Sequence, residues 1–205
     1  MGPSRMPALL RCAALVCGLC ASTALGRAQS LDPQGPEQGG TELQVWSGAG
    51  HSVKGGTNKI AVWNAGIRYG WVFTRPHGPG ILRGQFEYAI DWVPLNLIFQ
   101  PHSVAYGAGF NPFALKWLSV PRHGVTPYID LGGGVLYTSR EVPAGISNIN
   151  FASGSGVGVN IGRGKAHWSL ELRWMHISDA GLTEVNPGIN TVQVRAGLGW
   201  FRHRE

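Results

Sequence analysis

The chain has 205 residues and a mass of 22.0 kDa, with 17 Lys and Arg residues against 11 Asp and Glu residues. This length fits one domain or one barrel and leaves little room for two domains. Charged residues make up 14% of the chain and apolar residues 43%, which excludes a disordered protein built on a charged tail. The 31 glycines, with the aromatic and β-branched residues, favour a β protein over a helical bundle.

The first 28 residues have the pattern of a secretory signal peptide. Arg5 and Arg11 supply positive charge, residues 13–25 form an apolar core, and Gly26-Arg27-Ala28 is a small-x-small cleavage site. The apolar run is short for a helix that spans a bilayer. We therefore expect residues 1–28 to be removed, with an N-terminal anchor left in place as the alternative.

Cleavage would change the chemistry that the chain can carry. All three cysteines (Cys12, Cys17 and Cys20) would leave, and with them any disulfide, thiol nucleophile or cysteine metal site. The mature chain would keep 14 basic and 11 acidic residues, a net charge of +3, which gives little support to nucleic-acid binding. The seven histidines are scattered without the spacing of metal ligands. We expect no metal, no cofactor and no nucleic-acid partner.

Residues 29–40 read as a flexible linker rich in Pro, Gly and Gln, and residues 41–205 as one β-barrel domain. Turn clusters such as Gly162-Arg163-Gly164 divide this domain into alternating segments. The expected strands are residues 42–50, 58–73, 80–92, 103–118, 125–140, 148–162, 166–178 and 190–201. This series predicts an all-β fold: an eight-stranded antiparallel up-and-down transmembrane β-barrel.

The side chains on the two faces of the expected strands indicate which face meets lipid and which meets water. In residues 166–178 the apolar side chains of Trp168, Leu170, Leu172 and Trp174 alternate with Glu171 and Arg173. Several segments run past ten residues, the length that a tilted strand needs to cross a bilayer, and Trp and Tyr fall toward segment ends as in interfacial girdles. The apolar face is therefore expected to meet lipid, and the charges to pair in a narrow lumen. A secreted lipocalin-like barrel is the alternative.

One polar cluster lies on the apolar face. By parity, His176 and Ser178 continue the lipid-facing set of residues 168–174, and Asn190 lies outward on the next strand, among their cross-strand neighbours. With both termini in the periplasm, this cluster would lie at the external leaflet. Polar groups on an apolar face are costly unless they meet each other or a polar ligand. The alternative interpretation is a set of interfacial polar residues that end a strand near the headgroups.

The pattern His176-x-Ser178-x-Ala180-Gly181, followed by Asn186-x-Gly188, resembles the lipid A 3-O-deacylases and the broader acyloxyacyl-hydrolase-type outer-membrane family. The resemblance is sharpest over residues 174–190. It implies an outer-membrane serine esterase that removes the ester-linked 3-O-acyl chain of lipid A. Its partner would be lipid A or lipopolysaccharide in the outer leaflet, and a homodimer is possible.

Carried over by position, the resemblance makes Ser178 the nucleophile, His176 the general base and Asn186 an oxyanion donor, with a backbone N–H near Gly181 as a candidate second donor. Asn190 would orient the histidine, at a position where the family has Glu; an amide can hold an imidazole tautomer but supplies no charge. Two other acids are near in sequence, Glu184 and Asp179, although parity points Asp179 away from Ser178. The alternative functions are a non-catalytic structural or adhesin-like barrel, a small channel and an acyltransferase.

Overall fold

The structure, a computed structural model, describes residues 36–184 and 186–203. The expected signal peptide lies outside these residues, as does most of the expected linker. The described residues form eight strands and one short 3-10 turn. The elements are β1 Thr41–Ser52, β2 Ala61–Val72, η1 Gly80–Leu82, β3 Gly84–Gln100, β4 Ser103–Ser119, β5 Val125–Thr138, β6 Ile149–Ile161, β7 Ala166–Ser178 and β8 Ile189–Arg202.

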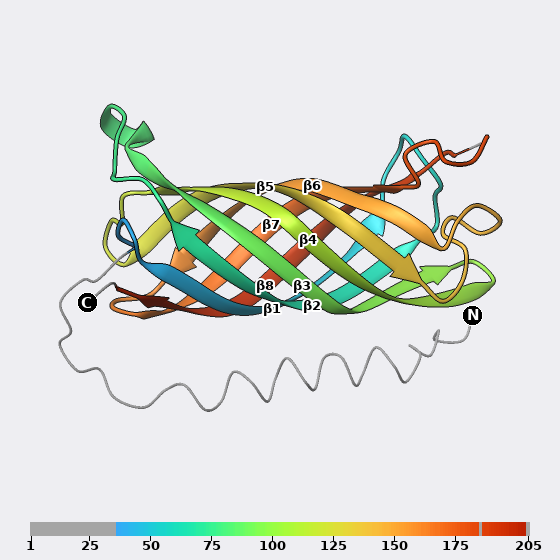
Figure 1. Cartoon of the computed structure of the whole chain (residues 1–205), viewed down its shortest axis with the longest axis horizontal. Coiled ribbons are helices and arrows are strands. Elements are labelled where there is room, and N and C mark those ends of the chain that lie inside the picture. Colours follow the sequence, from blue (N-terminus) through green and yellow to red (C-terminus); the bar gives the residue numbers. More distant parts are fainter. Residues whose placement is uncertain (1–35, 185, 204–205) are drawn as a thin grey trace, which may run out of the picture. The chain divides into compact units, whose positions relative to one another are not determined.

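The strands form a closed barrel (Figure 1). Each strand pairs antiparallel with the next along the chain, and β1 pairs with β8, so no strand has a free edge. The predicted eight-stranded up-and-down fold is therefore confirmed. No helix among residues 36–184 and 186–203 is long and apolar enough to cross a membrane.

Two features of the β2–β3–β4 region differ from the expectation. The expected strand of residues 80–92 ends before Pro94, whereas β3 continues through Pro94 to Gln100. The pairing of β3 with β4 shifts between Val93 and Asn96, and a bulge of this kind accommodates a residue that has no N–H to donate. Residues 80–82, expected to begin the strand, form η1 instead.

The two faces of the wall are chemically opposite. On β7, Leu172 is 52% exposed and Trp174 43%, while Glu171 and Arg173 are buried in the lumen. The apolar outer face continues along the other strands, and the predicted charged side chains lie inside. The interior also holds two clusters of buried apolar side chains, which the sequence analysis did not predict.

Ion pairs fill the lumen, as expected for a narrow barrel. Arg68 donates to Asp91 at 2.8 Å and also pairs with Asp130. Lys116 lies 2.5 Å from Glu42 and 3.3 Å from Glu87. Buried charges are tolerated when they are paired in this way.

The glycine run 154–158 makes room for this packing. A Cβ added at Gly156 would collide with the side chain of Glu171, and one at Gly158 with the ring of Tyr128. The run is therefore a packing feature of the barrel, and the phenol of Tyr128 donates to Glu171 at 3.1 Å.

The two ends of the barrel differ. β1 begins and β8 ends at one end, here called the terminal end, together with the β2–β3, β4–β5 and β6–β7 connections (Figure 1). The opposite, distal end carries the loops of residues 53–60, 101–102, 139–148 and 179–188. An apolar cluster inside the barrel packs the distal ends of β7 and β8 through Met175, Ile177 and Ile189. The backbone on either side of His176 is thus held from within.

Candidate functional site

The predicted site residues lie at the distal end of the β7–β8 hairpin. The register pairs His176 directly with Asn190, and Ile177 with Ile189. Ile177 and Ile189 are buried in the apolar cluster, so the strand alternation turns His176, Ser178 and Asn190 to the outer wall, where all three are half-buried.

The His176 and Asn190 side chains are in contact. Nδ1 of His176 lies 2.7 Å from Oδ1 of Asn190, and Nδ2 of Asn190 donates to the carbonyl oxygen of Gly55 at 2.9 Å. The Gly55 carbonyl accepts only, so it fixes which end of the amide faces the histidine. Since Oδ1 also accepts only, Nδ1 of His176 must donate in this hydrogen bond, so in the neutral imidazole the lone pair lies on Nε2.

The free edge of the imidazole lies against Gly188. A Cβ added at Gly188 would be 2.7 Å from Cε1 of His176 and 3.3 Å from Nε2. Gly188 also has φ +59°, a conformation that favours glycine. The ring stacks on Trp174, with an interplanar angle of 15° and 6.2 Å between ring centroids.

Ser178 lies on the same face of β7 as His176. The hairpin register ends at the pair of Ile177 and Ile189, so Ser178 is the last residue of β7, two positions beyond His176 and turned to the same outer wall. In the part of the chain that the structure describes, the Ser178 hydroxyl makes no hydrogen bond. The structure thus shows a hydrogen bond between His176 and Asn190, and none between the imidazole of His176 and the hydroxyl of Ser178.

A second serine on the outer wall was not predicted. Ser153 of β6 pairs in register with His176 and is exposed. It lies on the side of His176 away from β8, whereas the Nε2 edge faces Gly188 on the β8 side. Cross-strand pairing alone brings Ser153 to the site, and this pairing is set by the β6–β7 register rather than by a local motif.

Asp179 organises the loop between β7 and β8. Its carboxylate accepts from the backbone N–H of Gly181 at 3.0 Å and of Thr183 at 2.9 Å, from the Thr183 hydroxyl at 2.6 Å, and from the Asn186 amide. The hydrogen bonds, first that from the Thr183 side chain, hold the pKa of Asp179 below its usual range. The carboxylate therefore serves the loop and does not face Ser178, as parity predicted.

The hydrogen bonds of the Asn186 side chain determine whether it can also donate to an oxyanion. Its Oδ1 accepts from the backbone N–H of Gly188 at 2.9 Å, and its Nδ2 donates to Asp179. An amide nitrogen carries two hydrogens, so one stays available for another acceptor. The Gly181 N–H, considered as a second oxyanion donor, is already bonded to Asp179.

The other acid considered from the sequence is not joined to the histidine. Glu184 is exposed in the loop, and no ion pair or hydrogen bond links it to His176 among the described side chains. Asn190 is therefore the residue that is hydrogen-bonded to Nδ1 of His176. Within residues 36–184 and 186–203, no three His, Cys, Asp or Glu side chains are grouped to hold a metal ion.

The β1–β2 loop hydrogen-bonds to the β7–β8 hairpin, next to the pairing of β1 with β8 that closes the barrel. The backbone N–H of Val53 donates to the Asn190 carbonyl and that of Thr57 to the Gly188 carbonyl, both at 2.8 Å. These two segments lie side by side at the distal end in Figure 1. The Gly55 carbonyl thus contacts Asn190 although the two residues are 135 positions apart in the sequence, and no local motif predicts this contact.

Comparison with known proteins gives one family and two similar structures. The family model described as "Lipid A 3-O-deacylase (PagL)" matches residues 63–199. The crystal structure of the outer membrane enzyme PagL is 18% identical, with a TM-score of 0.55 over 75% of this chain and 97% of that chain. The outer membrane protein OprG from Pseudomonas aeruginosa is 10% identical, with a TM-score of 0.54 over 84% of this chain and all of that chain. No curated protein sequence matches this chain.

Proposed function

Because this chain belongs to the lipid A 3-O-deacylase (PagL) family of outer-membrane β-barrels, we propose that it is a serine esterase that hydrolyses the 3-O-acyl ester of lipid A. The observation that supports this most is the imidazole on the outer wall: Nδ1 is bonded to Asn190, and Ser178 lies two residues along the same face of β7. A histidine in this tautomer can act as a general base toward a neighbouring hydroxyl.

In the proposed reaction, Nε2 of His176 takes the proton of the Ser178 hydroxyl as Oγ attacks the ester carbonyl carbon. The carbonyl electron pair moves to oxygen, and the free N–H of Asn186 stabilises this oxyanion. Collapse of the tetrahedral intermediate breaks the bond to the sugar oxygen, which receives the proton from His176. The fatty acyl group then remains on Ser178 as an ester.

Water completes the cycle. His176 removes a proton from a water molecule that attacks the acyl-enzyme, and the second intermediate collapses with return of the proton to Oγ of Ser178. The products are a free fatty acid and lipid A with a free sugar hydroxyl. Asn190 acts in both halves as a positioning residue, since its Oδ1 keeps the proton on Nδ1.

The position on the outer wall suits a substrate that already lies in the membrane. Trp174 and Leu172, immediately below His176 on the same face, are 43% and 52% exposed and would contact hydrocarbon. An ester near the headgroup region could therefore reach Ser178 without extraction of its acyl chain, which would cost about 0.8 kcal/mol for each CH₂ exposed to water.

The test is to express the chain in an outer membrane and measure the mass of lipid A. We expect loss of one acyl group, abolished by Ser178→Ala and by His176→Ala and retained in Ser153→Ala, which removes the other serine hydroxyl beside the histidine. Folding of each variant is checked by its heat-modifiable electrophoretic mobility. Unchanged lipid A in a folded preparation would contradict the proposal and leave the non-catalytic barrel.

A further inference from the structure

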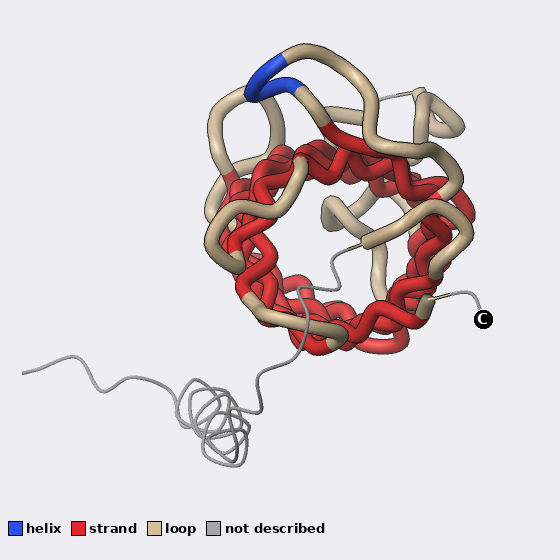
Figure 2. Tube along the Cα trace, turned by 90° about the vertical axis from the view of Figure 1, so that its left-hand side faces the viewer, coloured by secondary structure: helices blue, strands red, loops and turns tan. Residues whose placement is uncertain are grey.

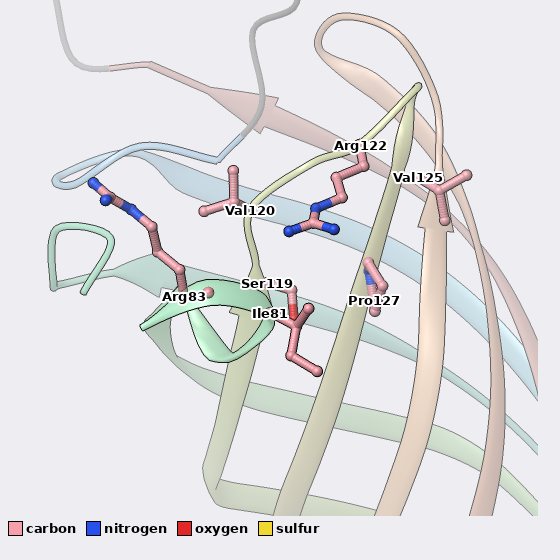
Figure 3. Close-up of a pocket in the computed structure, with 8 residues that line it drawn as sticks. Ile81, Arg83, Ser119, Val120, Arg122, Val125 and Pro127 are labelled. Carbon is pink, nitrogen blue, oxygen red and sulfur yellow. The ribbon is translucent and has the colours of Figure 1, made fainter. Parts of the chain in front are cut away.

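A second site lies at the other end of the molecule. A pocket of about 290 Å³ opens on the outer wall at the terminal end, where β4 and β5 meet the β2–β3 connection. Figure 3 shows Arg83 and Arg122 on two sides of this pocket, with Ile81 and Pro127 at its wall. Its volume is at the lower limit of small-molecule sites.

The two arginines have guanidinium groups without protein partners. Both side chains are exposed, and neither takes part in a hydrogen bond or an ion pair with any described residue. Their backbones are nevertheless fixed: the Val120 N–H donates to the Arg83 carbonyl at 3.0 Å, and Arg122 and Val125 exchange hydrogen bonds of 2.8 and 2.9 Å. Two unpaired guanidinium groups on fixed backbone beside a pocket are suited to a phosphate or another oxyanion.

The rim of the pocket also presents apolar side chains. Ile81 is 78% exposed and Leu82 65%. Both belong to η1, which stands outside the ring of strands rather than over the lumen (Figure 2). An apolar turn that projects sideways from a membrane barrel meets lipid instead of covering the pore.

The level of the pocket follows from the tryptophans. Trp117 lies two residues before Ser119, which lines the pocket, and outward tryptophans also occur near the same end of β2, β7 and β8: Trp71, Trp168 and Trp200. Such a girdle marks the boundary between hydrocarbon and headgroups. The pocket lies just beyond it, at headgroup level.

The terminal end of the barrel also carries more positive charge than the distal end. The described terminal end has one acid in its connections and end segments, Glu37, against six Lys and Arg residues. These are Arg75, Arg83, Arg122, Arg163, Lys165 and Arg202. The described distal loops have as many acids as Lys and Arg residues: Glu141, Asp179 and Glu184 against Lys54, Lys59 and Arg140. An anionic ligand is therefore favoured at the terminal end.

We propose that this pocket binds the phosphate of an anionic glycerophospholipid in the membrane leaflet at the terminal end, which faces the periplasm if both termini lie there. Arg83 and Arg122 hold the phosphate, and Ile81 and Leu82 contact the glycerol and the first acyl-chain carbons of the same lipid. The site is remote from His176 and does not depend on the proposed catalysis. A bound lipid would fix the depth of the barrel on the side opposite the catalytic loop.

The experiment is native mass spectrometry of the folded full-length barrel titrated with phosphatidylglycerol, with phosphatidylcholine and inorganic phosphate as separate probes. Arg83→Gln combined with Arg122→Gln should weaken retention of phosphatidylglycerol about 30-fold. The matched control is Arg163→Gln combined with Arg202→Gln, which removes the same charge from the same end and should change retention less than about twofold. Ile81→Ser with Leu82→Ser should also weaken retention, since it removes the acyl-chain contact.

Three results would overturn the proposal. Equal retention by wild type and by the Arg83/Arg122 variant would exclude these two residues. An equal loss in the Arg163/Arg202 control would indicate a diffuse charge effect rather than a pocket. Displacement of the lipid by millimolar inorganic phosphate, with the Ile81/Leu82 variant unaffected, would indicate a free-anion site. Normal heat-modifiable mobility of each variant establishes that the loss is not misfolding.

Discussion

Nδ1 of His176 and Oδ1 of Asn190 lie 2.7 Å apart on directly paired residues of β7 and β8. The amide can set the histidine tautomer but cannot stabilise the imidazolium by charge. Asn190→Leu should therefore lower the rate of acyl release about 100-fold or more. Asn190→Glu should raise it about tenfold, because a hydrogen bond to a carboxylate is stronger than one to an amide.

Both variants are compared by initial rates on purified lipid A. An unchanged rate in Asn190→Leu would show that Asn190 does not position the histidine. A lower rate in Asn190→Glu would indicate that repulsion between the carboxylate and the Gly55 carbonyl, now 2.9 Å from Nδ2, outweighs the gain in charge.

Gly188 should be needed for activity beyond its effect on stability. In Gly188→Ala the new Cβ would meet the His176 ring at 2.7 Å and turn it from Ser178, so kcat should fall about 100-fold. Gly181→Ala is the matched control: Gly181 also has a positive φ, +82°, but its Cβ would meet nothing within 4 Å. Thermal unfolding should shift similarly in both variants, and equal kcat values would contradict the assigned contact.

Asp179 should matter through Asn186. Asp179→Ala removes the acceptor shared by Gly181, Thr183 and Asn186, so the loop should loosen and the rate should fall about tenfold while the barrel stays folded. Asp179→Asn keeps one acceptor oxygen and should have a smaller effect. Amide hydrogen exchange at Gly181 and Thr183 measures the loosening, and protection equal to wild type in Asp179→Ala would contradict this role.

The loop should also depend on pH in one direction. The pKa of Asp179 is lowered in the folded protein, chiefly by the Thr183 side chain, so its contribution is fully present above the ordinary aspartate value of about 3.9 and is lost as pH falls through the lower folded value. Exchange protection at Gly181 and Thr183, corrected for intrinsic rates, should stay constant from neutral pH to about pH 5. Loss of protection in that range would show that the carboxylate does not hold the loop.

Arg68 should be a stability residue of the lumen. Arg68→Met leaves Asp91 and Asp130 buried with one partner fewer, which should lower the free energy of unfolding by about 3–5 kcal/mol. Arg75→Met is the control, since the Arg75 side chain is exposed and, among the described residues, bonds only to Gln38 at 2.9 Å; it should cost about 0.5 kcal/mol or less. Urea unfolding in bilayers measures both, and similar midpoints would contradict the role of the ion pairs.

The alternation of side chains was enough to predict the barrel, the lipid-facing stripe and the outward position of His176, because each depends on a period of two along single strands. Pro94 was misread because a bulge depends on the partner strand. The Gly55 carbonyl and Ser153 were missed for a related reason: both reach the site through register and loop packing between distant segments. The single polar link between Asn186 and Asp179 likewise depends on the path of the loop.

Labelling with a lipophilic alkyl fluorophosphonate, followed by peptide mass spectrometry, tests the central assignment most directly, since this reagent forms a covalent adduct with an activated serine. We predict one adduct, on Ser178, that is absent in His176→Ala and unchanged in Ser153→Ala. An adduct on Ser153, or an unlabelled Ser178 in a preparation that still removes an acyl chain from lipid A, would contradict the assignment.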